Sequence, residues 1–218
     1  MQRTNTFLLL SFTTLLFTAC RKEDIRSTGV ISTEVRSVPT FTDVRIEGPI
    51  NAEIRYGLTQ EVMVRTDVSA LSKMRTTVSN NTLILSLDQA NYGNGLRFEA
   101  TVYMPTIGRL TQNGVSDTRL SGFFGLQTLE VISNGVGDLD LHGSADRLLI
   151  TQHGVGRLDA QGMNVDTCQV GLSGVGSVEV RVNELLHGYL SGVGSIYYHG
   201  TPQVNINDTG VGNVIRVD

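Results

Sequence analysis

The chain of 218 residues lacks tryptophan, has only four prolines and is poor in charged residues, which make up 17% of it. It is rich instead in glycine, with 24 copies, and this mixture disfavours long helices and favours strands joined by tight turns. A hydrophobic content of 40% is enough for a folded core. A basic excess is also missing, because the formal net charge is −4 and the isoelectric point is near 5.6. We therefore expect no nucleic-acid partner.

Cysteine is nearly absent, and its two copies are Cys20 and Cys168. An apolar run over residues 7–17 is too short for a permanent membrane span and predicts a signal peptide over residues 1–19. The end of this run resembles the lipobox of bacterial lipoproteins, which implies cleavage before the cysteine and acylation of it: Leu16-Phe17-Thr18-Ala19-Cys20. The alternative is an ordinary signal peptide that happens to end near a cysteine. With Cys20 used as the anchor, no partner remains for a disulfide.

Residues 20–40 are polar and show little periodicity, so we expect a lipid-anchored cysteine followed by a tether. The triplet Lys22-Glu23-Asp24 is similar to the signal that passes some Gram-negative lipoproteins to the outer face of the outer membrane. The expected location is therefore the outer membrane, through the lipid anchor, with the protein exposed at the surface or facing the periplasm.

Residues 41–105 show short alternating runs between turn signals, such as 44–47, 52–56 and 82–87. The one helical turn that we expect lies over 68–74. This region is interpreted as an antiparallel sheet, or as irregular first coils, that caps the rest of one continuous domain.

Residues 106–218 contain a repeat of Gly-Val-Gly, with Gly-Val-Ser in the first copy, and the copies are separated by 21, 19, 20, 18 and 18 residues. A period near 19 fits a β-solenoid and is too short for propeller blades or helix pairs. We therefore predict an all-β fold, a β-helix-like solenoid of about six coils behind a β-rich cap. The predicted structural corners contain Gly114, Gly135, Gly137, Gly154, Gly156, Gly174, Gly176, Gly192, Gly194, Gly210 and Gly212.

Alignment of the copies on their first glycine predicts which side chains stack. The fourth and sixth positions after that glycine are apolar in five of six copies, as are two positions on the strand before it, so alternate side chains face inward. Cys168 falls in an inward column and is expected to be buried. We further expect the corner glycines to adopt positive φ, the valine between them to point inward, and a variable loop to close each coil.

With the repeat aligned, the chain resembles the head GIN domain family, described as putative autotransporter adhesin heads, over about 41–217. The resemblance is carried by the strand over 41–46 that leads into Gly48-Pro49-Ile50-Asn51, by the ending Tyr103-Met104-Pro105 and by the repeated corners. It implies an exported β-solenoid with a role in adhesion. The tripeptide Gly-Ile-Asn that names the family is interrupted here by Pro49.

We find no catalytic motif, no cofactor-binding motif and no convincing metal site in the sequence. His142 and His199 share a register but lie three coils apart, which is too far for a common metal ion. His153 and His187 lie in other positions of the repeat. The Gly-Val-Gly copies lack the lysine and the helix of a phosphate-binding loop.

The outward column at the fifth position is the weak candidate for a calcium or glycan site: Arg119, Asp140, Asp159, Glu179, Tyr197 and Ile215. Its other interpretation is a solvated face whose charges happen to align. The leading function hypothesis is a noncatalytic envelope lipoprotein whose solenoid surface binds a glycan or an envelope protein. The alternatives are a calcium-dependent carbohydrate-active enzyme that uses Asp140, Asp159 and Glu179, and a purely structural or sensory envelope protein.

Overall fold

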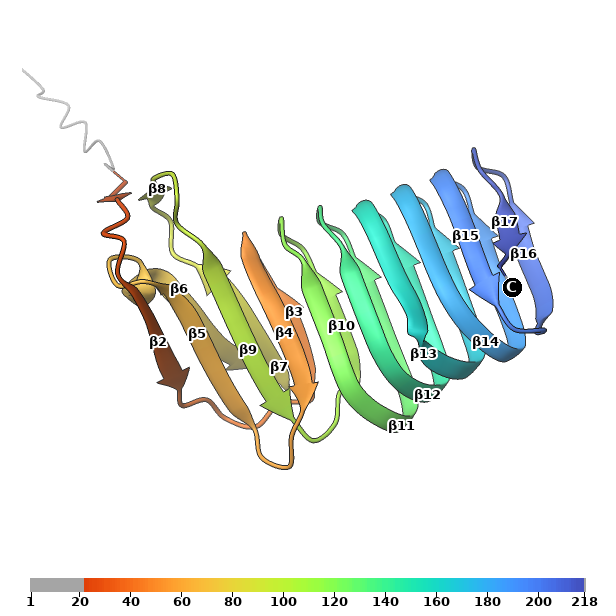
Figure 1. Ribbon diagram of the computed structural model, residues 1–218, viewed down its shortest axis with the longest axis horizontal. Coiled ribbons are helices and arrows are strands. Elements are labelled where there is room, and N and C mark those ends of the chain that lie inside the picture. The colour runs from red at the N-terminus through yellow and green to blue at the C-terminus, as the bar shows by residue number, and fades with distance from the viewer. Residues whose placement is uncertain (1–21, 218) are drawn as a thin grey trace, which may run out of the picture.

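The computed structural model describes residues 22–217, so the predicted signal peptide and Cys20 lie outside the described residues. Over these residues the chain forms an elongated β-solenoid with one short 3-10 helix (Figure 1). The elements are β1 (Asp24–Ile25), β2 (Ile31–Arg36), β3 (Asp43–Ile46), β4 (Ile50–Tyr56), β5 (Glu61–Asp67), η1 (Leu71–Lys73), β6 (Met74–Ser79), β7 (Thr82–Leu87), β8 (Asn91–Tyr92), β9 (Phe98–Met104), β10 (Arg109–Gln112), β11 (Thr118–Ser133), β12 (Leu139–Gln152), β13 (Val155–Leu172), β14 (Val175–Leu190), β15 (Val193–His199), β16 (Gln203–Asp208) and β17 (Val214–Arg216).

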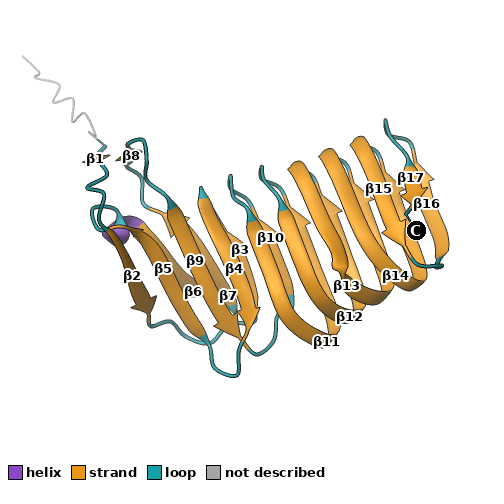
Figure 2. Ribbon diagram, viewed as in Figure 1, coloured by secondary structure: helices purple, strands orange, loops and turns teal. Residues whose placement is uncertain are grey.

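The repeat region stacks its strands in parallel, one coil upon the next, from β10 through β14 to β15, β16 and β17. This confirms the predicted β-solenoid. It makes about five turns rather than six, because six corners enclose five complete coils. The predicted loop between the two strands of a coil is absent over most of this region. Instead β11 to β14 each continue as one strand of 14–18 residues around the bend opposite the corners (Figure 2).

The predicted inward columns form the core. The fourth position stacks Thr118 on Leu139, Leu158, Val178 and Ile196, and the sixth stacks Leu120 on Leu141 and, in later coils, Ala160 and Val180; all of these are buried. Cys168 is fully buried, as expected, and burial raises the pKa of its thiol far above its usual range. The columns are less well covered toward the C-terminal end, where Tyr198 is half-buried and Val204 and Arg216 are exposed.

The corner valines do not point inward, and this expectation was wrong. All six are exposed, by 48% to 71%. The alternation of the strands places the residues on either side of each valine, and not the valine itself, toward the interior.

The two glycines of a corner serve different purposes, so the expectation of positive φ holds for only one of them. The second glycine has φ between 126° and 158° in Gly137, Gly156, Gly176, Gly194 and Gly212. The first does not have positive φ. A Cβ on Gly135 would lie 2.0 Å from the carbonyl oxygen of Gly114 in the preceding coil, so close stacking of the backbones excludes a side chain there.

Residues 41–105 contain both of the arrangements that we considered. Strands β3 and β4, and then β7 and β9, continue the parallel stack as early coils. Antiparallel strands then close the end, with β5 and β2 on one face and β6 on the other. The expected helical turn is the 3-10 helix η1.

Much of the expected tether is ordered, which corrects the interpretation of residues 20–40. Strand β1 pairs with β8, β2 pairs with β5, and Ile25 is buried. The loop between them is held by Asp67, which accepts hydrogen bonds of 2.7 to 3.0 Å from Ser27, Thr28, Gly29 and Ser69. A free tether can therefore span only a few residues after Cys20. Among residues 22–217, no helix has the length and apolar character needed to cross a membrane.

Candidate binding groove on the outer face

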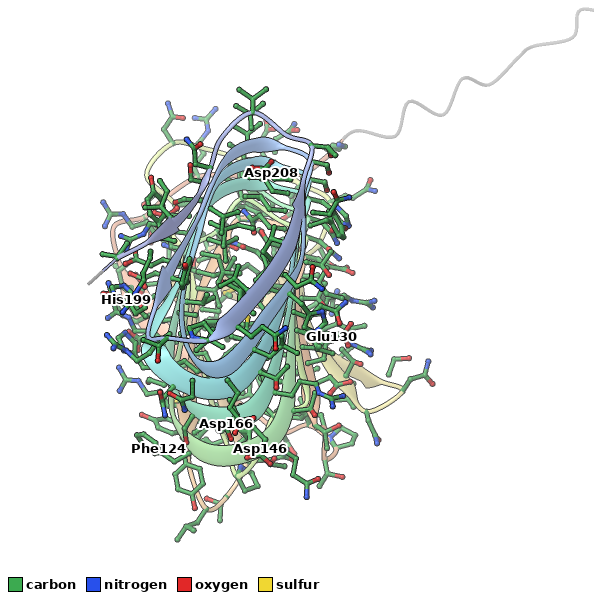
Figure 3. All side chains as sticks on the ribbon, turned by 90° about the vertical axis from the view of Figure 1, so that its right-hand side faces the viewer. Phe124, Glu130, Asp146, Asp166, His199 and Asp208 are labelled. Atoms are coloured by element: carbon green, nitrogen blue, oxygen red, sulfur yellow. The ribbon has the colours of Figure 1, made fainter. Side chains whose placement is uncertain are left out.

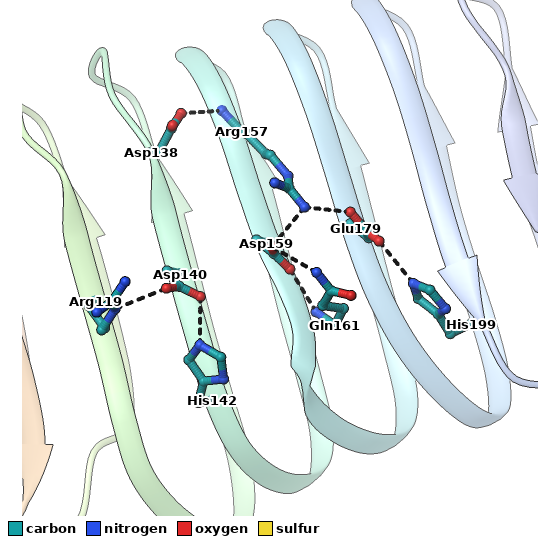
Figure 4. A network of polar contacts seen from close by, with 9 residues as sticks. All are labelled: Arg119, Asp138, Asp140, His142, Arg157, Asp159, Gln161, Glu179 and His199. Carbon is teal, nitrogen blue, oxygen red and sulfur yellow. Dashed lines mark hydrogen bonds and ion pairs between the residues drawn. The ribbon is translucent and has the colours of Figure 1, made fainter. Parts of the chain in front are cut away.

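The acidic column lies on the outer face of the solenoid in the register that the sequence predicts. Arg119 of β11 pairs with Asp140 of β12, and the column continues through Asp159 and Glu179 to Tyr197. The strands therefore place three carboxylates on three adjacent coils, within reach of the basic side chains around them (Figure 4).

Asp140 is held between two basic side chains. The Nε atom of Arg119 lies 2.9 Å from Asp140 Oδ2, and the Nε2 atom of His142 lies 2.8 Å from Asp140 Oδ1. The imidazole of His142 also covers Gly162, where a Cβ would lie 2.1 Å from its Nδ1 atom. His142 thus lies over Gly162 on the outer face, bonded to Asp140, with half of its side chain exposed.

Asp159 and Glu179 share one guanidinium. The Nη2 atom of Arg157 lies 2.7 Å from Asp159 Oδ2 and 2.7 Å from Glu179 Oε2. Glu179 also contacts His199, with 2.9 Å between Oε1 and Nε2. The contact with His199, together with Arg157, lowers the pKa of the Glu179 carboxyl below its usual range, although partial burial acts in the opposite direction.

This arrangement leaves the carboxylates little capacity for calcium. A calcium ion needs six to eight oxygen ligands, and here the oxygens face Arg119, Arg157, His142 and His199. Within residues 22–217, no group of three or more His, Cys, Asp or Glu side chains is placed to hold a metal ion. His153 contacts Ser173 across the corners at 2.5 Å, and His187 lies on β14 beside Gln169 and Asn205.

A second outward column, just after the corners, was missed by the sequence reasoning. In this column, Asn51 accepts a hydrogen bond from the backbone amide of Asp117, Asp117 from that of Asp138, and Asp138 from that of Arg157, over 2.8 to 3.1 Å. These side chains tie each coil to the next. The available signal was the aspartate two residues after each of the first two corner valines, at Asp117 and Asp138.

The two columns meet in a groove of about 600 Å³ that crosses β9, β4, β11, β12 and β13. Its lining residues are Asn51, Ala52, Glu53, Glu99, Ala100, Thr101, Asp117, Thr118, Arg119, Asp138, Leu139, Asp140, Arg157 and Asp159. None of these is His, Ser or Cys, so the lining holds no Ser–His or Cys–His nucleophilic pair and offers mainly hydrogen bonds and charge.

The groove carries more acidic than basic side chains, and arginines beside it partly offset this negative charge. Its lining contains six carboxylates and two arginines. Two further arginines pair with the rim, Arg55 with Glu53 and Arg65 with Glu99, each at 2.5 Å. The surface therefore repels anions and presents many oriented acceptors, with a few donors, to a polar ligand.

Comparison with known proteins places the chain among adhesin-like solenoids. A family model described as "Putative auto-transporter adhesin, head GIN domain" matches residues 40–202. A crystal structure of a putative adhesin from Bacteroides fragilis has a TM-score of 0.73 and 22% identity, and the match covers 88% of this chain and all of that one. A putative adhesin from Parabacteroides distasonis has a TM-score of 0.57 and 18% identity, covering 89% of this chain and all of that one.

Another similar structure from Parabacteroides distasonis is described as a putative lipid binding protein, with a TM-score of 0.52 and 16% identity over 90% of this chain and all of that one. No curated protein matches the chain. At these identities the solved structures show the fold, while the family model covers most of the sequence. The chain therefore belongs to the head GIN domain family of adhesin-like β-solenoid proteins.

Proposed function

We propose that this protein is a noncatalytic lipoprotein of the cell envelope, acylated on Cys20, whose outer groove binds a glycan. The observation that supports the ligand is the groove itself, a polar surface that crosses five parallel strands and contains no Ser–His or Cys–His pair. Its carboxylates already have arginine or backbone partners. They are therefore positioned as acceptors for hydroxyl groups.

The charge of the groove narrows the class of glycan. Six carboxylates against two lining arginines disfavour sulfated or uronic-acid polymers. A neutral glycan can donate its hydroxyl protons to these carboxylates without bringing a like charge. The regular spacing of the coils, about 4.8 Å, also suits a repeating polymer.

The anchor is supported by the lipobox-like residues that end at Cys20, and a location in the cell envelope is supported by the adhesin-like family. Orientation at the outer membrane can be tested by protease treatment of intact cells. A lower amount of the protein in treated than in untreated cells indicates surface exposure, which adhesion to another cell requires. An unchanged amount indicates that the protein faces the periplasm.

The ligand is tested by screening the protein on an array of neutral and anionic glycans and by titrating each hit calorimetrically. Thr101→Arg places a long side chain in the groove on β9, and we expect it to abolish binding. Thr128→Arg, at an exposed position of β11 outside the groove lining, is the matched control and keeps binding. Selective binding of anionic glycans, or equal binding by both variants, contradicts the proposed site.

A further inference from the structure

The six corner valines form an exposed ridge along one edge of the solenoid. This Val ridge consists of Val115, Val136, Val155, Val175, Val193 and Val211, which are 48% to 71% exposed. Successive members pair in parallel across neighbouring coils. With about 4.8 Å between coils, the ridge is about 24 Å long.

No charged residue lies within the Val ridge, and the nearest charged residues in the sequence, Asp117, Asp138 and Arg157, come two positions after its first three valines. The residues two positions before the valines are Asn113, Asn134, His153, Ser173, Ser191 and Thr209, and those directly after them are Ser116, Gly137, Gly156, Gly176, Gly194 and Gly212. None of these is Asp, Glu, Lys or Arg. An exposed apolar stripe of this length, without interrupting charge, is typical of an interaction surface.

The backbone of the corners explains their glycines but not their valines. Coil contacts exclude a side chain at the first glycine, and positive φ favours the second. The middle residue points to solvent, where threonine has the same branched shape and the same preference for extended backbone. Six valines and no threonine therefore indicate that the ridge faces an apolar or interfacial environment.

The N-terminal end of the described chain lies at the same edge as the Val ridge. Strand β3 leads into the corner at Gly48, and its neighbour β7 ends beside it, so the connection from β7 to β9 takes the place of a corner. This connection contains β8, to which β1 is paired (Figure 2). Backbone hydrogen bonds of 2.8 Å join Asn91 to Glu23 and Gly93 to Ile25.

We propose that the Val ridge rests on the bilayer that holds the acylated Cys20, so that the solenoid axis runs parallel to the membrane. This inference rests on the proposed lipid anchor. Only Arg21 separates Cys20 from Lys22, and the two residue steps between them can span at most about 7 Å. The ridge edge is thus kept close to the membrane surface, and the anchor supplies a high effective concentration that lets weakly apolar side chains bind.

The opposite edge of the molecule, at the bend of each coil, differs from the Val ridge because it carries charged side chains. Phe124 is 77% exposed at the bend, and the same bend bears the carboxylates of Asp146 and Asp166 (Figure 3). Charges on this edge favour contact with water. A protein that lies on its Val ridge holds this bend away from the bilayer and leaves the outer groove, on the side of the solenoid, open to a ligand.

The absence of tryptophan allows a direct test with a single reporter. Val155→Trp is introduced into the full acylated protein, which is reconstituted into vesicles of phosphatidylethanolamine and phosphatidylglycerol with or without brominated acyl chains. We expect the emission to move to shorter wavelengths and the brominated lipid to quench it. Val193→Trp should behave in the same way, while Phe124→Trp, the matched control, should keep a solvent-like spectrum.

Mass spectrometry of the same sample separates this inference from the proposed anchor. Acylated Cys20 with a solvent-like, unquenched spectrum at both ridge positions would overturn the membrane contact and leave the anchor intact. An unmodified Cys20 would overturn both. A spectral shift that depends on protein concentration and occurs in detergent without lipid would instead assign the ridge to a second copy of the chain and overturn the proposal.

Discussion

Arg157 and Glu179 form an ion pair of 2.7 Å between adjacent coils, and the same guanidinium reaches Asp159 at 2.7 Å. One cation thus keeps two stacked carboxylates from repelling each other. We expect Arg157→Ala to lower the free energy of unfolding by about 0.5–1 kcal/mol, because the pairs are partly exposed and screened by solvent. Urea denaturation measures this change. Arg147→Ala, outside the column, is the control, and an equal loss in both variants would contradict a special role for Arg157.

Calcium should not stabilise the wild-type protein, since its acidic column faces arginine and histidine rather than an open set of oxygens. Thermal unfolding with calcium and with a chelator measures this directly. A rise in the melting temperature that disappears in the Asp159→Ala, Glu179→Ala double variant would favour the calcium-dependent enzyme over the noncatalytic proposal.

Two valines of β13 should respond to the same substitution to very different degrees. Val170 is fully buried, and Val170→Ala removes two methyl groups from the core, so we expect a loss of roughly 2 kcal/mol in the free energy of unfolding. Val155 is 48% exposed on the ridge, and Val155→Ala should change the stability in solution by no more than about 0.5 kcal/mol. A large loss at Val155 would mean that the corner side chains pack inward after all.

Alanine should be tolerated at some glycines of the solenoid and not at its corners. A Cβ on Gly154 would lie 2.1 Å from the carbonyl oxygen of Gly135, so the stacked backbones must separate. We expect Gly154→Ala to cost roughly 1–3 kcal/mol. A Cβ on Gly108 would lie 3.1 Å from the Oδ1 atom of Asp43, a side-chain atom that can move away. Gly108→Ala is therefore the control, because it replaces a glycine without forcing backbones apart. Chemical denaturation distinguishes the two.

The N-terminal segment should detach in acid because of Asp67, which is 1% exposed. Burial alone would raise the pKa of its carboxyl, but hydrogen bonds from Ser69, Thr28 and Ser27 outweigh burial and hold the pKa far below its usual range. Because the pKa of Asp67 is lower in the folded than in the unfolded protein, its charge stabilises the segment at every pH above the unfolded-state pKa of about 3.9. This stabilisation is lost progressively as the pH falls from that value toward the lower pKa of the folded state. Hydrogen exchange over 27–36 measures the loss.

Asp67→Asn removes the charge and should weaken protection of the same segment at neutral pH while abolishing its dependence on acid. Glu34→Gln, at an exposed position of β2, is the control that leaves both unchanged. Protection of residues 27–36 that does not respond to pH in the wild-type protein would show that other contacts, such as the β2–β5 pairing, hold the segment without Asp67.

The fold was largely predictable because each coil of the solenoid corresponds to one copy of a sequence repeat. Once the copies are aligned, register follows, and Arg119, Asp140, Asp159 and Glu179 fall into one column in the structure as in the alignment. The groove was not predictable. It needs β9 and β4 beside β11, and these strands carry no Gly-Val-Gly corner that would place them in the stack.

The sequence by itself determined the parallel stack, the inward columns and the burial of Cys168, since a period-two pattern repeated every 18 to 21 residues allows one consistent core. Only the tertiary structure decided the direction of the corner valines and the partners of the acidic column. Both depend on local geometry between coils: the turn at each corner sets which way its middle side chain points, and the reach of Arg157 and His199 sets which carboxylates are neutralised. A pattern of residue types along one chain does not contain these distances.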